Sequence, residues 1–259
     1  MRAMLITAAA SAALIATPAL AQDAAPAPDA PTKVEAGQNA APPAEPAAEA
    51  PKGPFTLEVD LALVSDYRFR GVSLSNSKIA VQPAITLTHD SGFHIGTWAS
   101  NIAPNEGGDV EVDLVGGWGK TIGPIDFDIN ATYYVYPGVR DINYVEFIST
   151  ASHAFGNLTL GTTFAYTPRQ GDAAPKRGLY GAVNGSFTIP KTALSINGSF
   201  GIEDNAFYHN KRDWSLGVAA DFLGFTIGAN YVKATHIDSD PLGRGRLLLS
   251  LTKSFENSF

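Results

Sequence analysis

The chain has 259 residues, a formal net charge of −7 at pH 7 and no cysteine. The absence of cysteine excludes disulfides, thiolate metal or redox centres, and a lipoprotein anchor on an N-terminal cysteine. An acidic charge balance without a basic patch argues against a nucleic-acid partner.

Residues 1–21 have the pattern of an export signal. Arg2 supplies a positive charge, residues 3–17 form an alanine-rich apolar run, and residues 18–21 end in the small-x-small pattern that signal peptidase cuts. A retained transmembrane helix is the alternative, but the run is barely long enough and alanine is only mildly apolar. We therefore predict a signal peptide that is removed after Ala21.

Residues 22–54 have a different composition, in which Ala, Pro, Glu and Asp dominate. Repeated prolines block helices and strands, and no large side chains are present to form a core. We predict a disordered linker, for which a peptidoglycan contact or a spacer role are the functional alternatives.

Residues 55–259 are dominated by alternation of apolar and polar residues with period two, as in Phe55-Thr-Leu-Glu-Val-Asp-Leu. Such a segment predicts a strand with one apolar and one polar face, and its length is close to the ~9–11 residues that a tilted transmembrane strand needs. No apolar stretch after residue 21 is long enough for a transmembrane helix, so a membrane-embedded chain has to be a closed barrel. The predicted strands are residues 55–66, 79–89, 93–102, 110–119, 125–136, 142–155, 158–167, 178–189, 193–203, 213–222, 225–236 and 245–255.

The links between these strands alternate in length. Short links at 90–92, 120–124, 156–157, 190–191 and 223–224 alternate with longer ones at 68–78, 103–109, 168–177, 204–212 and 237–244, and only the link at 137–141 departs from the pattern. Outer-membrane barrels have long outer loops and short periplasmic turns, so the pattern places both ends of the domain in the periplasm.

A soluble β-sandwich is the alternative fold, because it also has alternating strands and short turns. Here the polar faces are rich in Gly, Ala, Ser, Asn and Thr, which suit a lumen, and aromatic residues gather near strand ends as in interfacial girdles. We therefore predict an all-β protein, a transmembrane antiparallel up-and-down β-barrel of about twelve strands with a disordered N-terminal tether, embedded in outer-membrane lipid.

The last predicted strand is amphipathic and aromatic near its end. Leu247, Leu249, Leu251 and Phe255 occupy alternate positions, and residues 256–259 follow the strand and end in Phe259. This pattern resembles the signal that directs outer-membrane barrels to the barrel-assembly machinery, which is therefore a predicted partner. Either Phe255 or Phe259 can supply the terminal aromatic residue.

If the larger residues of the strands face lipid, the residues at the alternate positions face the lumen. Carboxylates that line a narrow pore favour cations, so a surplus of acids predicts a cation-leaning pore. The alternative is that these acids only hydrate the wall or pair with inward-folded loop arginines. The candidate pore-lining residues are Glu58, Asp60, Glu111, Asp113, Asp126, Asp128, Glu146, Asp221 and Arg246.

The segment that follows the first strand, residues 65–75, reads Ser-Asp-Tyr-Arg-Phe-Arg-Gly-Val-Ser-Leu-Ser. Asp66, Arg68 and Arg70 predict an ion-pair network at the outer mouth. A solvated loop with ordinary ion pairs, worth ~0–1 kcal/mol each, is the alternative.

This segment, together with Gln82-Pro83-Ala84, resembles the opening signature of the TorF family of proposed porins, a proteobacterial family of unknown function. The resemblance covers residues 55–259. It departs around the second strand, where the family often has Pro-Ala-Gln and this chain has Val-Gln-Pro-Ala. The resemblance implies an outer-membrane barrel that passes small solutes, and it implies no substrate and no catalytic residues.

Enzymatic chemistry has little support in the sequence. The five histidines lie in five separate segments, and no pair has metal-ligand spacing. Ser152 and His153 are neighbours in a strand and point to opposite faces, so they cannot act as a nucleophile and base pair. We predict no cofactor, no metal and no enzyme, with an outer-membrane hydrolase as the weakest alternative.

The predicted function is therefore passive diffusion of small hydrophilic solutes through a porin. A non-conducting structural or interaction barrel of the outer membrane is the alternative.

Overall fold

The structure is a computed structural model that describes residues 53–105, 108–237 and 241–259. The predicted signal peptide, and the predicted linker up to residue 52, lie outside the described residues, so these two assignments stay predictions. In the part of the chain that is described, no helix is long and apolar enough to cross a membrane.

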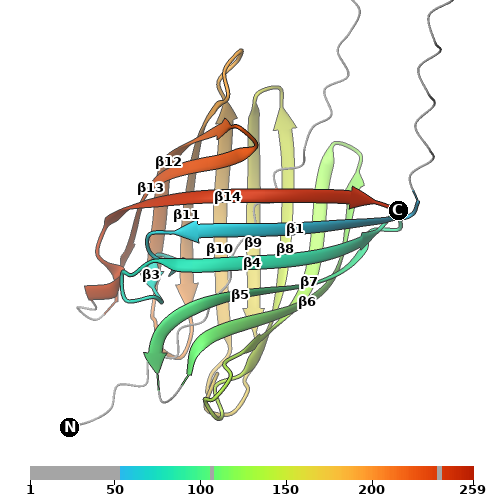
Figure 1. The fold of residues 1–259 in the computed structure, drawn as a ribbon. Helices are drawn as coiled ribbons and strands as arrows, with labels where there is room; N and C mark the ends of the chain where they lie inside the picture. Colours follow the sequence, from blue (N-terminus) through green and yellow to red (C-terminus); the bar gives the residue numbers. More distant parts are fainter. Residues whose placement is uncertain (1–52, 106–107, 238–240) are drawn as a thin grey trace, which may run out of the picture. The chain divides into compact units, whose positions relative to one another are not determined.

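Twelve antiparallel strands form a closed barrel, in which sequence neighbours pair with each other and β1 pairs with β14 (Figure 1). This confirms the predicted fold, and the predicted strand bounds differ from the observed ones by at most three residues. The wall consists of β1 (Phe55–Val64), β4 (Ala80–His89), β5 (Phe93–Asn105), β6 (Gly108–Ile122), β7 (Ile125–Val135), β8 (Tyr144–Phe155), β9 (Leu158–Thr167), β10 (Gly178–Thr188), β11 (Leu194–Asp204), β12 (Lys211–Phe222), β13 (Phe225–Thr235) and β14 (Arg246–Ser258).

The two faces of the wall differ in polarity because successive side chains of a strand point to opposite faces. Large apolar side chains lie on the outer face and are widely exposed, as for Ile95 (64%), Ile129 (57%) and Leu216 (59%). Exposed apolar area around a whole barrel is far more than a water-soluble surface tolerates, whereas the hydrocarbon of a bilayer covers it at no cost. The side chains at the alternate positions of each strand point into the lumen.

The two ends of the barrel differ in the length of their connections. The ends of β1 and β14 that carry Phe55 and Ser258 lie at the end of the barrel with the short turns. The turn between β4 and β5 shows why glycine is needed there: Gly92 has φ +98°, and an added Cβ would lie 2.1 Å from the carbonyl oxygen of Gly119. The longer connections of the described chain lie at the opposite end, but the predicted long link at 103–109 is wrong, because β5 continues to Asn105 and β6 begins at Gly108.

The last strand is longer than predicted. The sequence places its end at residue 255, but β14 continues to Ser258, which is paired with Thr56. Phe259 then exchanges two backbone hydrogen bonds with Phe55, at 3.2 and 2.9 Å. The extension follows from closure, because the first residues of β1 need hydrogen-bond partners on the edge that β14 covers.

The predicted loop at residues 68–78 is the main departure from a simple barrel. It contains a separate two-stranded hairpin, β2 (Arg68–Phe69) and β3 (Val72–Ser73), which is not part of the wall. The wall is complete without it, since β1 and β4 pair directly up to Val64 and Ala80.

Candidate functional site

Residues 66–75, called the inner hairpin below, fold into the barrel. Although this segment joins two adjacent strands, it contacts inward-facing residues of strands on the far side of the lumen, as detailed below. The buried side chains of the segment are those of Asp66, Tyr67, Phe69, Arg70, Val72, Ser73, Leu74 and Ser75, each 9% exposed or less. The inner hairpin therefore crosses the lumen at the long-loop end.

The shape of the inner hairpin follows from a two-residue turn and one carboxylate. Arg70 and Gly71 both have positive φ, at 42° and 84°, which is the conformation that tight hairpin turns require. Asp66 accepts hydrogen bonds from Ser73 Oγ at 2.5 Å and Ser75 Oγ at 3.1 Å, and it pairs with Arg68 Nε at 2.8 Å. One side chain thus holds both arms of the hairpin together.

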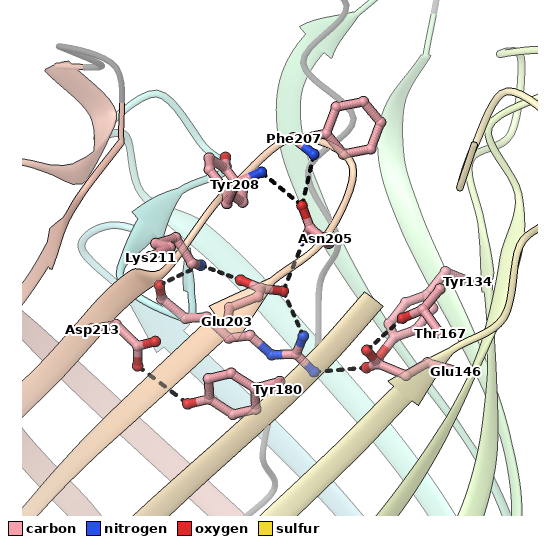
Figure 2. A network of polar contacts seen from close by, with 11 residues as sticks. Tyr134, Glu146, Thr167, Tyr180, Glu203, Asn205, Phe207, Tyr208, Lys211 and Asp213 are labelled. Carbon is pink, nitrogen blue, oxygen red and sulfur yellow. Dashed lines mark hydrogen bonds and ion pairs between the residues drawn. The ribbon is translucent and has the colours of Figure 1, made fainter. Parts of the chain in front are cut away.

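Arg70, at the tip, makes the contacts that span the lumen, with the wall residues Glu146, Tyr180 and Glu203 that are labelled in Figure 2. Its Nη1 lies 2.7 Å from Glu203 Oε1 of β11, and its Nη2 lies 2.8 Å from Glu146 Oε2 of β8. The guanidinium carbon lies 4.0 Å from the centre of the Tyr180 ring of β10. Burial by itself lowers the pKa of a guanidinium, but these two carboxylates outweigh it and hold the pKa of Arg70 above its ordinary value.

Lys211 completes this cluster from β12. Its Nζ lies 2.5 Å from Glu203 Oε2 and donates a hydrogen bond of 2.9 Å to the backbone carbonyl of Arg70. Lys211 is 1% exposed, Glu146 is 1% exposed and Glu203 is 2% exposed. Buried ions are tolerated only when each is paired, so the cluster forms a single interdependent unit.

A second contact fixes the other side of the inner hairpin. Tyr67 Oη donates to Glu111 Oε1 of β6 at 3.1 Å, and the Tyr67 ring lies 5.2 Å from that of Trp98 of β5. Burial, followed by the charge of Glu111, raises the pKa of Tyr67 well above its ordinary value, so the phenol keeps its proton. Tyr67 therefore remains a hydrogen-bond donor to this carboxylate.

The nine charged residues predicted to line the pore all lie on the inward parity, but the structure does not bring them together. Glu111, Asp113 and Glu146 are buried at the level of the inner hairpin. Their role as pore-lining groups stays a prediction. Towards the short-turn end lie Glu58, Asp60, Asp126, Asp128 and Asp221, whereas Arg246 is exposed at the long-loop end.

Four of the acids near the short-turn end bond to neighbouring side chains of the wall. Asp126 accepts from Thr121 and Asp221 accepts from Thr226, each at 2.6 Å. Asp60 accepts from Ser254, and Asp128 accepts from Asn130 at 2.8 Å. At this level, the carboxylates are wall groups with local partners.

The ion-pair network that the sequence predicted at the outer mouth is split into two separate sets of contacts in the structure. Arg68 pairs with Asp66 inside the hairpin, whereas Arg70 pairs with Glu146 and Glu203 of the wall. Sequence reasoning did not single out Glu203, although it lies two residues beyond Gly201 on the inward parity of its predicted strand. It missed Lys211 because the predicted strand began at residue 213 and left Lys211 in a loop.

Comparison with known proteins places the chain in a family. Residues 48–247 match the model of a family described as a bacterial protein of unknown function (Gcw_chp). The chain belongs to the Gcw_chp family. No curated protein matches this Gcw_chp chain.

Solved structures share its fold at low sequence identity. A KdgM porin in complex with disordered oligogalacturonate is 7% identical with a TM-score of 0.50, over 79% of this chain and 99% of that one. A NanC porin is 8% identical with a TM-score of 0.50, over 78% of this chain and 99% of that one. At such identities the likeness shows the barrel fold alone.

Proposed function

We propose that this Gcw_chp protein is an outer-membrane porin that passes small hydrophilic solutes by passive diffusion and is narrowed by its inner hairpin. The observation that carries the proposal is a closed barrel with an apolar outer face and a polar inner face. A polar inner face behind an apolar outer face is the arrangement of a barrel with a water-filled lumen.

Three further features support the proposal. The predicted signal peptide over residues 1–21 would export the chain, and the amphipathic β14 would engage the barrel-assembly machinery. The resemblance of residues 65–75 to the TorF signature suggests the same role. The two porins of similar fold, one of them bound to oligogalacturonate, are channels of comparable length.

The lumen contains more acids than bases, which favours a cation-leaning pore. At the level of the inner hairpin, however, the two carboxylates of Glu146 and Glu203 are balanced by the two cations Arg70 and Lys211. We therefore propose that cation preference is weak while the hairpin is in place and grows when it leaves. No enzymatic step is part of this proposal.

Planar-bilayer recording of the refolded barrel tests the channel. A matched variant replaces residues 66–75 by a flexible Gly/Ser segment of the same length, which leaves the wall intact. We expect discrete conductance steps for both proteins, larger for the variant. Reversal potentials in a salt gradient then report ion preference, and anion preference would contradict the cation inference.

The alternative is a non-conducting structural barrel, and the buried ion cluster under the inner hairpin is the observation that favours it. If neither protein conducts across a range of voltages, the channel is refuted and the structural barrel is supported. Conductance of the variant alone would identify the inner hairpin as a plug.

A further inference from the structure

The side chain of Arg70 occupies a site that the barrel wall has already built. Glu146 and Glu203 come from β8 and β11, with β9 and β10 between them. Three strand spacings of ~4.8 Å separate the two backbones along the wall, so the carboxylates reach towards each other over Tyr180 of β10. A guanidinium fills the space between them.

The chemistry of this site selects one class of cation. Two carboxylates approach the guanidinium from different directions, and each takes one of its terminal nitrogens. A planar cation with several fixed N–H donors satisfies both at once, whereas an ammonium acts as a point charge. The Tyr180 ring, 4.0 Å below the guanidinium carbon, adds a cation–π contact that also favours a flat cation.

The wall residues around Arg70 carry an excess of negative charge. Glu203 already pairs with Lys211, so Glu146, Glu203 and Lys211 carry a net charge of −1 when all three are ionised (two acids and one base). Buried Asp213, which accepts a hydrogen bond from Tyr180 Oη at 3.2 Å, adds a further acid. The cation that supplies the missing charge belongs to the inner hairpin and not to the wall.

The cation is carried on a segment whose departure would leave the wall intact. β1 and β4 pair directly as far as Val64 and Ala80, so the pairing of these two strands does not depend on the inner hairpin. Leu74 N bonds to Tyr67 O within the hairpin, Lys78 N bonds to Ser75 O at its end, and Ala103 N of β5 bonds to Leu74 O. Side chains therefore provide most of the anchoring.

We propose that Glu146, Glu203 and Tyr180 form a recognition site for solutes that carry a guanidinium group, and that Arg70 is an internal stand-in which such a solute replaces. The inference rests on the proposed channel, which brings solutes into the lumen, and it names their class. Displacement exchanges one guanidinium for another, so the buried carboxylates stay paired throughout. A neutral solute cannot do this, because it would leave buried Glu146 without a cation and Glu203 with Lys211 alone.

A single introduced thiol can report displacement of the inner hairpin. The chain has no cysteine, so Val72→Cys places the only thiol on a side chain that is 3% exposed. A charged thiol reagent reacts with it in the refolded full-length barrel only when the hairpin has left its site. Asn76→Cys, at an exposed position of the same loop, is the control for direct effects on the reagent.

Arginine and methylguanidinium at millimolar concentration are the probes, with citrulline and sodium chloride at equal concentration as controls. We expect the two guanidinium compounds to raise the modification rate of Val72→Cys by ~5-fold or more, and citrulline and salt to leave it unchanged. Adding Glu146→Gln and Glu203→Gln should raise the basal rate and abolish the response to arginine. Equal acceleration by citrulline or salt, or no acceleration by arginine, overturns the proposal.

Calorimetric titration of the Arg70→Ala barrel with methylguanidinium gives a second measurement. We expect binding that disappears when Glu146→Gln and Glu203→Gln are added. Absence of binding to a folded Arg70→Ala barrel overturns the proposal, and so does binding there without any effect on the Val72→Cys rate. If Arg70→Ala fails to fold, the Val72→Cys rates alone decide.

These measurements need no current through the barrel. A barrel that never conducts but responds to arginine would support the recognition site and refute the channel. A barrel that conducts but does not respond to arginine would support the channel and refute the recognition site.

Discussion

Replacing Arg70 by methionine should release the inner hairpin while the barrel remains closed. Methionine keeps much of the side-chain volume but removes the charge that pairs with Glu146 and Glu203 at 2.8 and 2.7 Å. Removing one partner of a buried ion pair costs ~3–5 kcal/mol, because the other charge stays buried without its counter-ion.

That cost applies to the inserted position of the inner hairpin. When the hairpin leaves, water can reach the two carboxylates, and the penalty is relieved. At 1.4 kcal/mol per factor of ten, the ratio of displaced to inserted hairpin should rise by roughly two to three and a half orders of magnitude. The wall should be little affected, because its hydrogen-bonded pairs do not include the hairpin.

Hydrogen exchange followed by mass spectrometry measures this ratio directly. The amide of Ala103 in β5, bonded to the carbonyl of Leu74 at 2.7 Å, reports on the inserted hairpin, and amides of β12 report on the wall. Arg169→Met, at an exposed loop position, is the matched control. Protection of the Ala103 amide in Arg70→Met within about twofold of wild type would refute the anchoring role of Arg70.

Three other changes test separate parts of the structure. Tyr67→Phe removes the hydrogen bond to buried Glu111, and we expect it to destabilise the inserted hairpin by ~1–3 kcal/mol in the same exchange experiment. Gly71→Ala puts a side chain at φ +84° and its Cβ 2.9 Å from Asp213 Cβ, so we expect faster exchange of hairpin amides and a larger conductance. Leu216→Arg places a charge on the outer face of β12, and we expect it to lower the free energy of unfolding in bilayers by ~2–4 kcal/mol.

Each of these three predictions has an outcome that would contradict it. Unchanged exchange in Tyr67→Phe would mean that the phenol does not anchor the hairpin. Wild-type conductance in Gly71→Ala would mean that the hairpin does not narrow the path. For Leu216→Arg the control is Leu216→Phe, and equal stability of the two variants would show that position 216 does not face lipid.

The wall of the barrel could be predicted from the sequence because its determinants are local. A strand with period two shows its apolar face in any window of a few residues, and link lengths indicate how strands follow one another. For this reason the twelve strands, their parity and the inward position of residues such as Glu146 were all predictable. The ends of the strands were hardest to predict where pairing with a distant strand sets them, as in the extension of β14 to Ser258.

The position of the inner hairpin could not be predicted in the same way. Residues 65–75 were expected at the outer mouth, and their charges suggested contacts among Asp66, Arg68 and Arg70. Only Arg68 and Asp66 pair with each other. Arg70 instead pairs with residues 76 and 133 positions later in the chain.

The sequence by itself thus determined the class of fold, the strand order and the two faces of the wall, because alternation and turn lengths are properties of neighbouring residues. The tertiary structure decided which charges meet. Glu146 and Glu203 come within reach of one guanidinium only because closure of twelve strands brings β8 and β11 around a common lumen. Burial in that lumen then makes an unpaired charge costly, and this cost turns an ordinary loop arginine into the anchor of the inner hairpin.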